Sequence, residues 1–171
     1  MSDSESISTG DGTVSGNGKL HTFSMPLHVI DKRQKRLKII EYAEKLLGIP
    51  YKFGAEWTEI SKVPFELDCS EMVEGLYKSV GLKMPDGSQA QHDFCIKTMT
   101  PQIADLAFFG RDGLEDRIYH VGLIFNKESI IEARAHDDTA SFRTGCVITR
   151  PISNWMKYKN FVGFFSHPAL I

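Results

Sequence analysis

The chain is organised around residues 67–77, which read Leu-Asp-Cys-Ser-Glu-Met-Val-Glu-Gly-Leu-Tyr. Apolar side chains recur there at helical spacing and predict an amphipathic helix with Met72 and Val73 on its apolar stripe. Asp68 can cap this helix, which places Cys69 in the first turn and on the same stripe. We therefore expect a helix that begins at a cysteine and faces a core.

This position favours a nucleophilic role for Cys69. The thiolate is the reactive form of cysteine, and the positive end of a helix dipole stabilises it. The free N–H groups of a first helical turn can also hold an oxyanion. The simpler alternative is a small buried residue that only packs, which is the usual role of a lone cysteine.

Length and composition indicate one globular domain with an attached tail. The chain has 171 residues, enough to bury a core without staples, and its hydrophobic and charged fractions of 42% and 25% are ordinary. Residues 1–25 are rich in Ser, Gly and Asp and predict a flexible tail or arm, so residues 26–171 form the domain. The net charge of −2 gives no indication of a nucleic-acid partner.

The cysteines indicate neither a disulfide framework nor a metal site. They are Cys69, Cys95 and Cys146, an odd number with wide spacing and no Cys-x-x-Cys pair. We expect no metal and no organic cofactor, and structural roles for Cys95 and Cys146. A metal site that combines cysteines with histidines, including His92 and His136, is an alternative with weak spacing.

No targeting segment is visible in the sequence. Met1 is not followed by a basic region and an apolar region, so we expect no signal peptide. The sequence has no run of 18 apolar residues, so we expect no membrane span. We expect synthesis in the reducing cytoplasm. Action outside the cell would then need lysis, a phage particle or another export route.

The remaining pattern predicts helices first and strands afterwards, which is an α+β arrangement with an antiparallel sheet. A first helix should open at Asp31 and end at Gly48, and a second short helix should cover Gln89 to Met99. The apolar face of the first helix should comprise Leu37, Ile40, Ala43, Leu46 and Leu47. Its basic residues should form a solvated face, with attraction to an anionic polymer as the alternative. The expected strands are Ile103–Phe109, Ile118–Phe125, Ser129–Ala135, Gly145–Thr149 and Phe161–Phe165.

A cysteine nucleophile needs a base and a group that orients the base. His120 stands at the start of an apolar strand, where a rigid strand end holds a ring well and Gly122 leaves room beside it. The orienting group should lie on the next strand, where Glu132 and His136 are candidates, and Asn126 in the turn is a weaker one.

The loop between these two strands decides which face Glu132 occupies. A four-residue loop over 126–129 would turn Glu132 away from His120. An odd loop or one bulge would pair Gly122 with Glu132 and place Glu132 and His120 on one face. The catalytic interpretation therefore predicts an odd loop or a bulge.

Four motifs in this order resemble the NlpC family of papain-like cysteine peptidases. They are Gly-Ile-Pro-Tyr-Lys-Phe-Gly at 48–54, Leu-Asp-Cys-Ser at 67–70, Ala-Asp-Leu-Ala-Phe-Phe at 104–109 and His-Val-Gly-Leu-Ile-Phe at 120–125. The resemblance covers about Lys38 to Phe165. It implies a papain-like fold of NlpC type, with N-terminal helices packed on the antiparallel sheet.

The resemblance also implies roles for individual residues. Cys69 becomes the nucleophile, His120 the base and Glu132 the third polar residue, where His, Asn or Gln is more usual. Tyr51 matches a tyrosine near the oxyanion site. The other expected oxyanion or substrate residues, all adjacent to the nucleophile, are Asp68, Ser70 and Glu71. The family usually has Gly at the position of Glu71, so we expect Glu71 to alter substrate preference.

The implied activity is hydrolysis of amide bonds in peptidoglycan stem peptides through a thioester. We expect a monomer, and a phage-encoded wall-degrading enzyme fits the sequence. One alternative is an amidase or acyltransferase with the same fold. Another is a non-catalytic module for wall binding or particle assembly.

Overall fold

The computed structural model describes residues 27–135 and 145–171. The predicted tail over residues 1–25 lies outside them. The helices are α1 (Leu27–Glu44), α2 (Cys69–Lys78), α3 (Ser88–Phe94) and α4 (Ile152–Met156). The strands are β1 (Ile96–Thr98), β2 (Leu106–Gly110), β3 (Ile118–Ile124), β4 (Ser129–Ala135), β5 (Gly145–Pro151) and β6 (Phe161–Ser166). Single 3-10 turns occur at Arg111–Gly113, Glu115–Arg117 and Pro168–Leu170.

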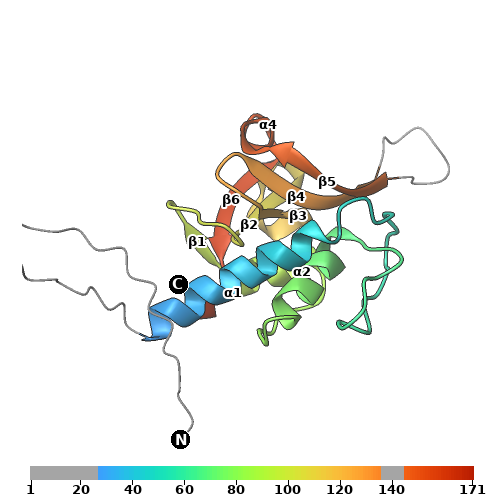
Figure 1. Cartoon of the computed structure of the whole chain (residues 1–171). Coiled ribbons are helices and arrows are strands. Elements are labelled where there is room, and N and C mark those ends of the chain that lie inside the picture. The colour runs from blue at the N-terminus through green and yellow to red at the C-terminus, as the bar shows by residue number, and fades with distance from the viewer. Residues whose placement is uncertain (1–26, 136–144) are drawn as a thin grey trace, which may run out of the picture.

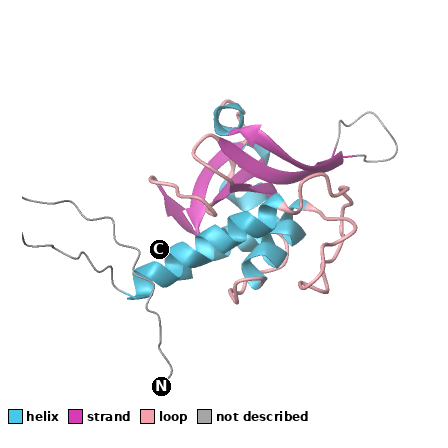
Figure 2. Cartoon of the chain, viewed as in Figure 1, coloured by secondary structure: helices cyan, strands magenta, loops and turns pink. Residues whose placement is uncertain are grey.

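The six strands form one antiparallel sheet in the order β1-β6-β2-β3-β4-β5. In Figure 1, α1 and α2 lie side by side against one face of this sheet, and α4 lies at the opposite side. Figure 2 shows the same separation of helices and strands. This is the predicted α+β class with N-terminal helices packed on an antiparallel sheet.

Two apolar clusters hold the layers together. The main core lies between the helices and the sheet, and the predicted stripe of α2 is fully buried in it through Met72, Val73, Leu76 and Tyr77. A smaller cluster lies on the other face, where Trp155 of α4 is fully buried. The sheet is therefore covered on both faces near its centre.

The first helix differs from its prediction at its start and in its orientation. It begins at Leu27 rather than Asp31 and ends at Glu44, before the predicted end at Gly48. Its inward side chains are Ile39 and Ala43, and Leu46 in the following turn is buried as well. The predicted face was wrong at its edges, because Leu37 and Leu47 are 43% and 44% exposed.

An ion pair explains this rotation of α1. Arg36 is buried and lies 2.7 Å from Asp105, and it also donates to the carbonyl oxygens of Ile103 and Leu170. A buried guanidinium with a carboxylate partner and carbonyl acceptors meets the hydrogen-bonding needs of a buried charge. Apolar periodicity alone places this arginine outside, so Arg36 is an exception to the predicted solvated basic face.

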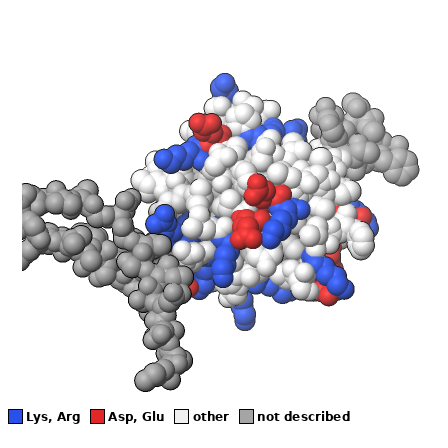
Figure 3. Space-filling view, viewed as in Figure 1, with Lys and Arg blue, Asp and Glu red and all other residues white. Residues whose placement is uncertain are grey.

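The exposed side of α1 carries charges of both signs. Lys35 pairs with Asp31 at 2.9 Å, and Lys45 pairs with Glu41 at 3.0 Å, each one helical turn apart. Figure 3 shows acidic and basic side chains next to one another on this face of the molecule. These side chains belong to the predicted solvated face.

The second short helix was predicted too long. It ends at Phe94, and Ile96–Thr98 forms edge strand β1, with Ile96 opposite Ser166 and Thr98 opposite Phe164. The backbone groups at the open edge of β6 draw this segment into the sheet. Among the described helices, none combines the length and the apolar character that a bilayer crossing requires.

Candidate active site

Cys69 is the first residue of α2, as predicted, and Asp68 is its N-cap. One carboxylate oxygen of Asp68 accepts hydrogen bonds from the Glu71 backbone N–H at 2.8 Å and from the Ser70 hydroxyl at 2.9 Å. The other oxygen accepts from the Gly54 N–H at 3.0 Å. Asp68 therefore caps the helix and ties the preceding loop to it.

Tyr51 reaches the same place through a short backbone pairing. Tyr51 bridges Leu67 in parallel, and the Lys52 N–H donates to the Leu67 carbonyl at 3.0 Å. Tyr51 thus lies beside the segment that leads into Cys69, and it is half-buried. Ser70 is held from the opposite side, because its carbonyl accepts from the Gln91 side-chain amide at 2.8 Å.

The register of β3 and β4 confirms the predicted odd loop. Leu123 lies opposite Ile131, Ile124 lies opposite Ile130, and the Phe125 N–H donates to the Ser129 carbonyl at 2.9 Å. The loop is therefore the three residues 126–128.

This register places Glu132 and His120 on one face of the sheet, because Gly122 falls opposite Glu132. His120 Nε2 lies 2.5 Å from Glu132 Oε2. Cys69 lies close enough to His120 to raise the pKa of the imidazole through its charge and hydrogen bonding. Since Glu132 occupies Nε2, Nδ1 is the ring nitrogen left for the sulfur.

The two other candidates for the orienting group have different outcomes. Asn126 uses its side-chain oxygen to accept backbone hydrogen bonds from Glu128 and Ser129, both at 2.9 Å, so it stabilises the loop instead. His136 lies outside the described residues.

Two residues that sequence reasoning missed complete the surroundings of Glu132. Arg150 Nε and Trp155 Nε1 both donate to Glu132 Oε1, the latter at 3.3 Å. Arg150 lies opposite Ile130 on β5, so it shares a face with Glu132. The predicted strand ended at Thr149. Extending its in-and-out alternation by one residue would have placed Arg150 in the strand as a candidate partner of Glu132.

Trp155 also packs against His120. The two rings are stacked with centroids 5.5 Å apart and an interplanar angle of 29°. A Cβ atom on Gly122 would come within 2.7 Å of the Trp155 ring and 2.6 Å of the Ile130 side chain. The predicted room beside Gly122 exists, and an indole occupies it.

Electrostatics favour the charged form of His120. Burial by itself lowers the pKa of His120, but the charge and hydrogen bond of Cys69, together with Glu132, outweigh it and raise this pKa to about 10. Burial raises the pKa of Glu132, whereas its bonds to His120 and Arg150 produce a net lowering. An imidazolium at His120 thus lies beside an ionised Glu132, whose other oxygen pairs with the Arg150 guanidinium.

Glu71 has a structural contact that the sequence did not indicate. Its carboxylate accepts the Trp57 backbone N–H at 2.5 Å, and burial is the main cause of its raised pKa. The Trp57 ring lies against Gly75, where a Cβ atom would come within 2.1 Å of it. The Trp57 indole N–H donates to the carbonyl oxygens of Glu59 and Lys62. Glu71 therefore helps to anchor the loop that precedes α2.

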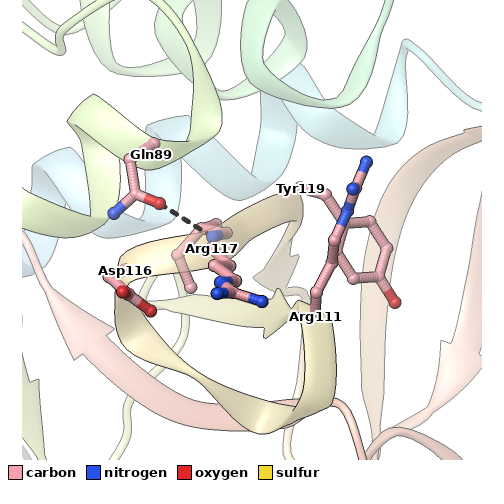
Figure 4. Close-up of a pocket in the computed structure, with 6 residues that line it drawn as sticks. Gln89, Arg111, Asp116, Arg117 and Tyr119 are labelled. Atoms are coloured by element: carbon pink, nitrogen blue, oxygen red, sulfur yellow. Dashed lines mark hydrogen bonds between the residues drawn. The ribbon is translucent and has the colours of Figure 1, made fainter.

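A hollow of about 370 Å³ lies at the start of β3, where Ile118 and Tyr119 help to line it. Figure 4 shows the side chains that line it, including Arg111, Arg117 and Tyr119. The dashed line marks the Ile118 N–H donating to the Gln89 side-chain oxygen at 2.8 Å, which joins α3 to β3. Tyr119 directly precedes His120, but successive side chains of a strand point to opposite faces, and His120 does not line this hollow.

A second hollow, of about 350 Å³, lies along α2 and carries the opposite charge. Its acidic lining residues are Glu56, Asp68, Glu71, Glu74 and Asp86. Within the described ranges, the group of Glu71, Glu74 and Asp86 alone brings three potential metal ligands within 4.8 Å of one another. The alternative metal site from cysteines and histidines thus finds no cluster in this part of the chain.

The other two cysteines differ from Cys69, although all three are free thiols. Cys95 is buried, and burial, together with Asp105, raises its pKa to about 12. Cys146 is half-buried on β5 beside Val147. A thiol with so high a pKa is almost entirely protonated near neutral pH, which matches a structural role for Cys95.

Comparison with known proteins identifies the family. Residues 48–164 match the model of the NlpC/P60 family, whereas no curated protein matches. An NlpC/P60 family protein from Bacillus cereus superposes with a TM-score of 0.63 at 22% identity. That match covers 77% of this chain but 40% of the other, so this chain spans about two fifths of the length of that protein.

Two proteins of Mycobacterium tuberculosis are also similar in structure. The peptidoglycan hydrolase RipB has a TM-score of 0.59 at 20% identity, with 85% of this chain and 73% of that chain covered. RipD, described as a non-catalytic NlpC/p60 domain protein adapted to peptidoglycan binding, has a TM-score of 0.58 at 18% identity. The match to RipD covers 79% of this chain and 98% of that chain. At these identities the likeness concerns the fold.

Proposed function

Because the chain belongs to the NlpC/P60 family, we propose that it is a cysteine peptidase that hydrolyses amide bonds in the peptide stems of peptidoglycan. The contact chain from Cys69 through His120 to Glu132 carries this proposal. It joins a nucleophile at a helix N-terminus, a base on a strand and an orienting carboxylate.

The proposed reaction has two stages, the formation of a thioester on Cys69 and its hydrolysis. The Cys69 thiolate attacks the amide carbonyl carbon, and the Cys69 backbone N–H and the Tyr51 hydroxyl hold the resulting oxyanion. His120 then gives a proton to the leaving amine, which departs and leaves a thioester on Cys69. Water, deprotonated by His120, attacks the thioester and releases the acid and the thiol.

One of the two hollows could bind a substrate with carboxylates, whereas the hollow along α2 is acidic. Stem peptides carry carboxylates, and Arg111 and Arg117 line the hollow at the start of β3. The guanidinium group binds carboxylates through paired hydrogen bonds. The resemblance in fold to the peptidoglycan hydrolase RipB supports the same substrate class.

A non-catalytic wall-binding or particle-assembly module is the second candidate, and RipD shows that the fold occurs without catalysis. An amidase or acyltransferase would use the same nucleophile with another acceptor. The interaction of Cys69 with His120 and the contact of His120 with Glu132 favour the catalytic candidates. Our proposal for location is synthesis in the cytoplasm, with access to the wall after lysis, on a phage particle or by another export route.

The test is digestion of purified peptidoglycan by the full chain and by Cys69→Ala, with products identified by mass spectrometry. We expect the wild type to release peptide fragments with new amino and carboxyl termini and Cys69→Ala to release none. A wild type that binds peptidoglycan without cutting it would overturn the peptidase proposal in favour of the binding module. Transfer of the acyl group to an added amine, in place of hydrolysis, would favour the acyltransferase.

A further inference from the structure

Glu132 is a carboxylate without solvent contact, and its two oxygens have different partners. Its side chain is 0% exposed. Oε2 lies 2.5 Å from His120 Nε2, whereas Oε1 accepts hydrogen bonds from Arg150 Nε and from Trp155 Nε1. These partners fix the rotation of the carboxylate, so one oxygen always faces His120.

Arg150 is itself held in place. Its side chain is 15% exposed, and its guanidinium carbon lies 5.7 Å from the Trp155 ring centre and 5.9 Å from that of Tyr158. Both ring contacts are at cation–π distance. The Arg150–Glu132 contact is therefore an enclosed ion pair, unlike the loose surface pairs that contribute little.

The charge balance at Glu132 depends on Arg150. The charged and titratable groups that face Glu132 are His120 from β3 and Arg150 from β5, and Cys69 of α2 lies beyond His120. His120 gains and loses its positive charge as it transfers protons, whereas the Arg150 guanidinium stays charged. Without Arg150, each loss of the imidazolium proton would leave a buried carboxylate with no counter-charge, and such a group takes up a proton.

We propose that Arg150 is a positioning residue of the Cys69–His120 site, which keeps Glu132 ionised and turned toward His120 whether or not His120 carries its second proton. This inference deepens the proposed function and rests on it for the proton transfers of His120. Arg150 acts through Glu132 and needs no contact with the substrate.

The experiment measures the alkylation rate of Cys69 by iodoacetamide from pH 4.5 to 9 on the full chain, with the modified residue located by peptide mass. In Arg150→Gln we expect the alkylation rate to fall off at a pH about one unit or more higher than in the wild type on the acidic side of the profile. The reason is that a buried carboxylate gains its proton more easily without the cation. Arg150→Lys keeps the charge and should stay close to the wild type. The matched control is Arg33→Gln, an exposed arginine on α1, whose profile should overlay the wild type.

An Arg150→Gln protein with a native circular dichroism spectrum and an unshifted profile would overturn the proposal. Where Arg150→Gln does not fold, the comparison is between Glu132→Gln and the double variant Glu132→Gln/Arg150→Gln. The single variant leaves a cation beside His120 without its partner, and the double variant removes it. Because Arg150 acts through Glu132, we expect the single and double variants to alkylate at equal rates near neutral pH. A roughly tenfold difference, which is about one pKa unit for the pair, would show an effect of Arg150 that bypasses Glu132 and would refute the positioning role.

Alkylation needs no peptidoglycan, so the two proposals can fail separately. A wild type whose Cys69 alkylates rapidly at mildly acidic pH but cuts no peptidoglycan contradicts the proposed substrate alone. An unshifted Arg150→Gln profile in a protein that does cut peptidoglycan contradicts the role of Arg150 alone.

Discussion

The Trp155 indole is stacked on the His120 imidazole, with ring centroids 5.5 Å apart, although 35 positions separate the two residues in the sequence. The stack is possible because Gly122, two residues after His120 on β3, has no side chain where the indole lies. One helix on the outer face of the sheet thus limits the motion of the expected base.

Gly122→Ala should displace Trp155. A Cβ atom would come within 2.7 Å of the indole, so either the ring or the backbone must move. Overpacking of this kind typically costs about 1–3 kcal/mol of unfolding free energy. We also expect slower alkylation of Cys69, because His120 loses its stacking partner. Chemical denaturation and alkylation rates measure the two effects, and a variant as stable and as reactive as the wild type would contradict the packing argument.

The pKa of His120 makes stability depend on pH in a definite direction. The folded pKa of about 10 lies above the ordinary histidine value of 6.5, so this group contributes stability that is fully present below pH 6.5 and lost as pH rises through about 10. We expect the free energy of unfolding to fall between pH 7 and pH 10. His120→Asn should show a smaller fall, and parallel curves for the two proteins would count against the raised pKa.

Glu71 should prove to be a loop anchor that also affects substrate choice. Glu71→Gln keeps an acceptor for the Trp57 N–H and should retain most of the stability, whereas Glu71→Gly removes the acceptor and should cost about 1–3 kcal/mol. We expect Glu71→Gly to change the ranking of stem-peptide substrates as the loop loosens. Thermal unfolding and competition between defined stem peptides are the measurements, and an unchanged ranking would refute the link to specificity.

Cys95→Ser and Cys146→Ser should both keep activity. Cys95 is buried with a pKa raised to about 12, and Cys146 is half-buried on β5, with no ion pair or side-chain hydrogen bond to the described site residues. Replacing a buried thiol by a hydroxyl costs stability, so Cys95→Ser should melt at a lower temperature than Cys146→Ser. Loss of peptidoglycan turnover in either folded variant would reassign that cysteine to the reaction.

Local patterns were sufficient for the elements that carry the expected nucleophile and base. The apolar stripe of α2 and the cap at Asp68 depend on neighbours within four residues, and both occur as predicted. The alternation of β4 predicted its bounds as Ser129–Ala135, which are those of the structure. Short-range rules failed at Arg36, because its partner Asp105 is 69 residues away and no periodicity encodes that pair.

The sequence by itself determined helices α1 and α2, the order of strands β2 to β6 and the position of Cys69 at a helix N-terminus, and it limited Glu132 to two possible faces. It did not indicate α4 or edge strand β1. Only the tertiary structure decided which face Glu132 occupies, through a three-residue loop, and which groups surround it. Arg150 and Trp155 come from β5 and α4, and they meet Glu132 because the sheet and its outer helix enclose one buried charge. A buried carboxylate needs partners from any part of the chain that can reach it, and strand pairing, unlike local spacing, determines which parts can.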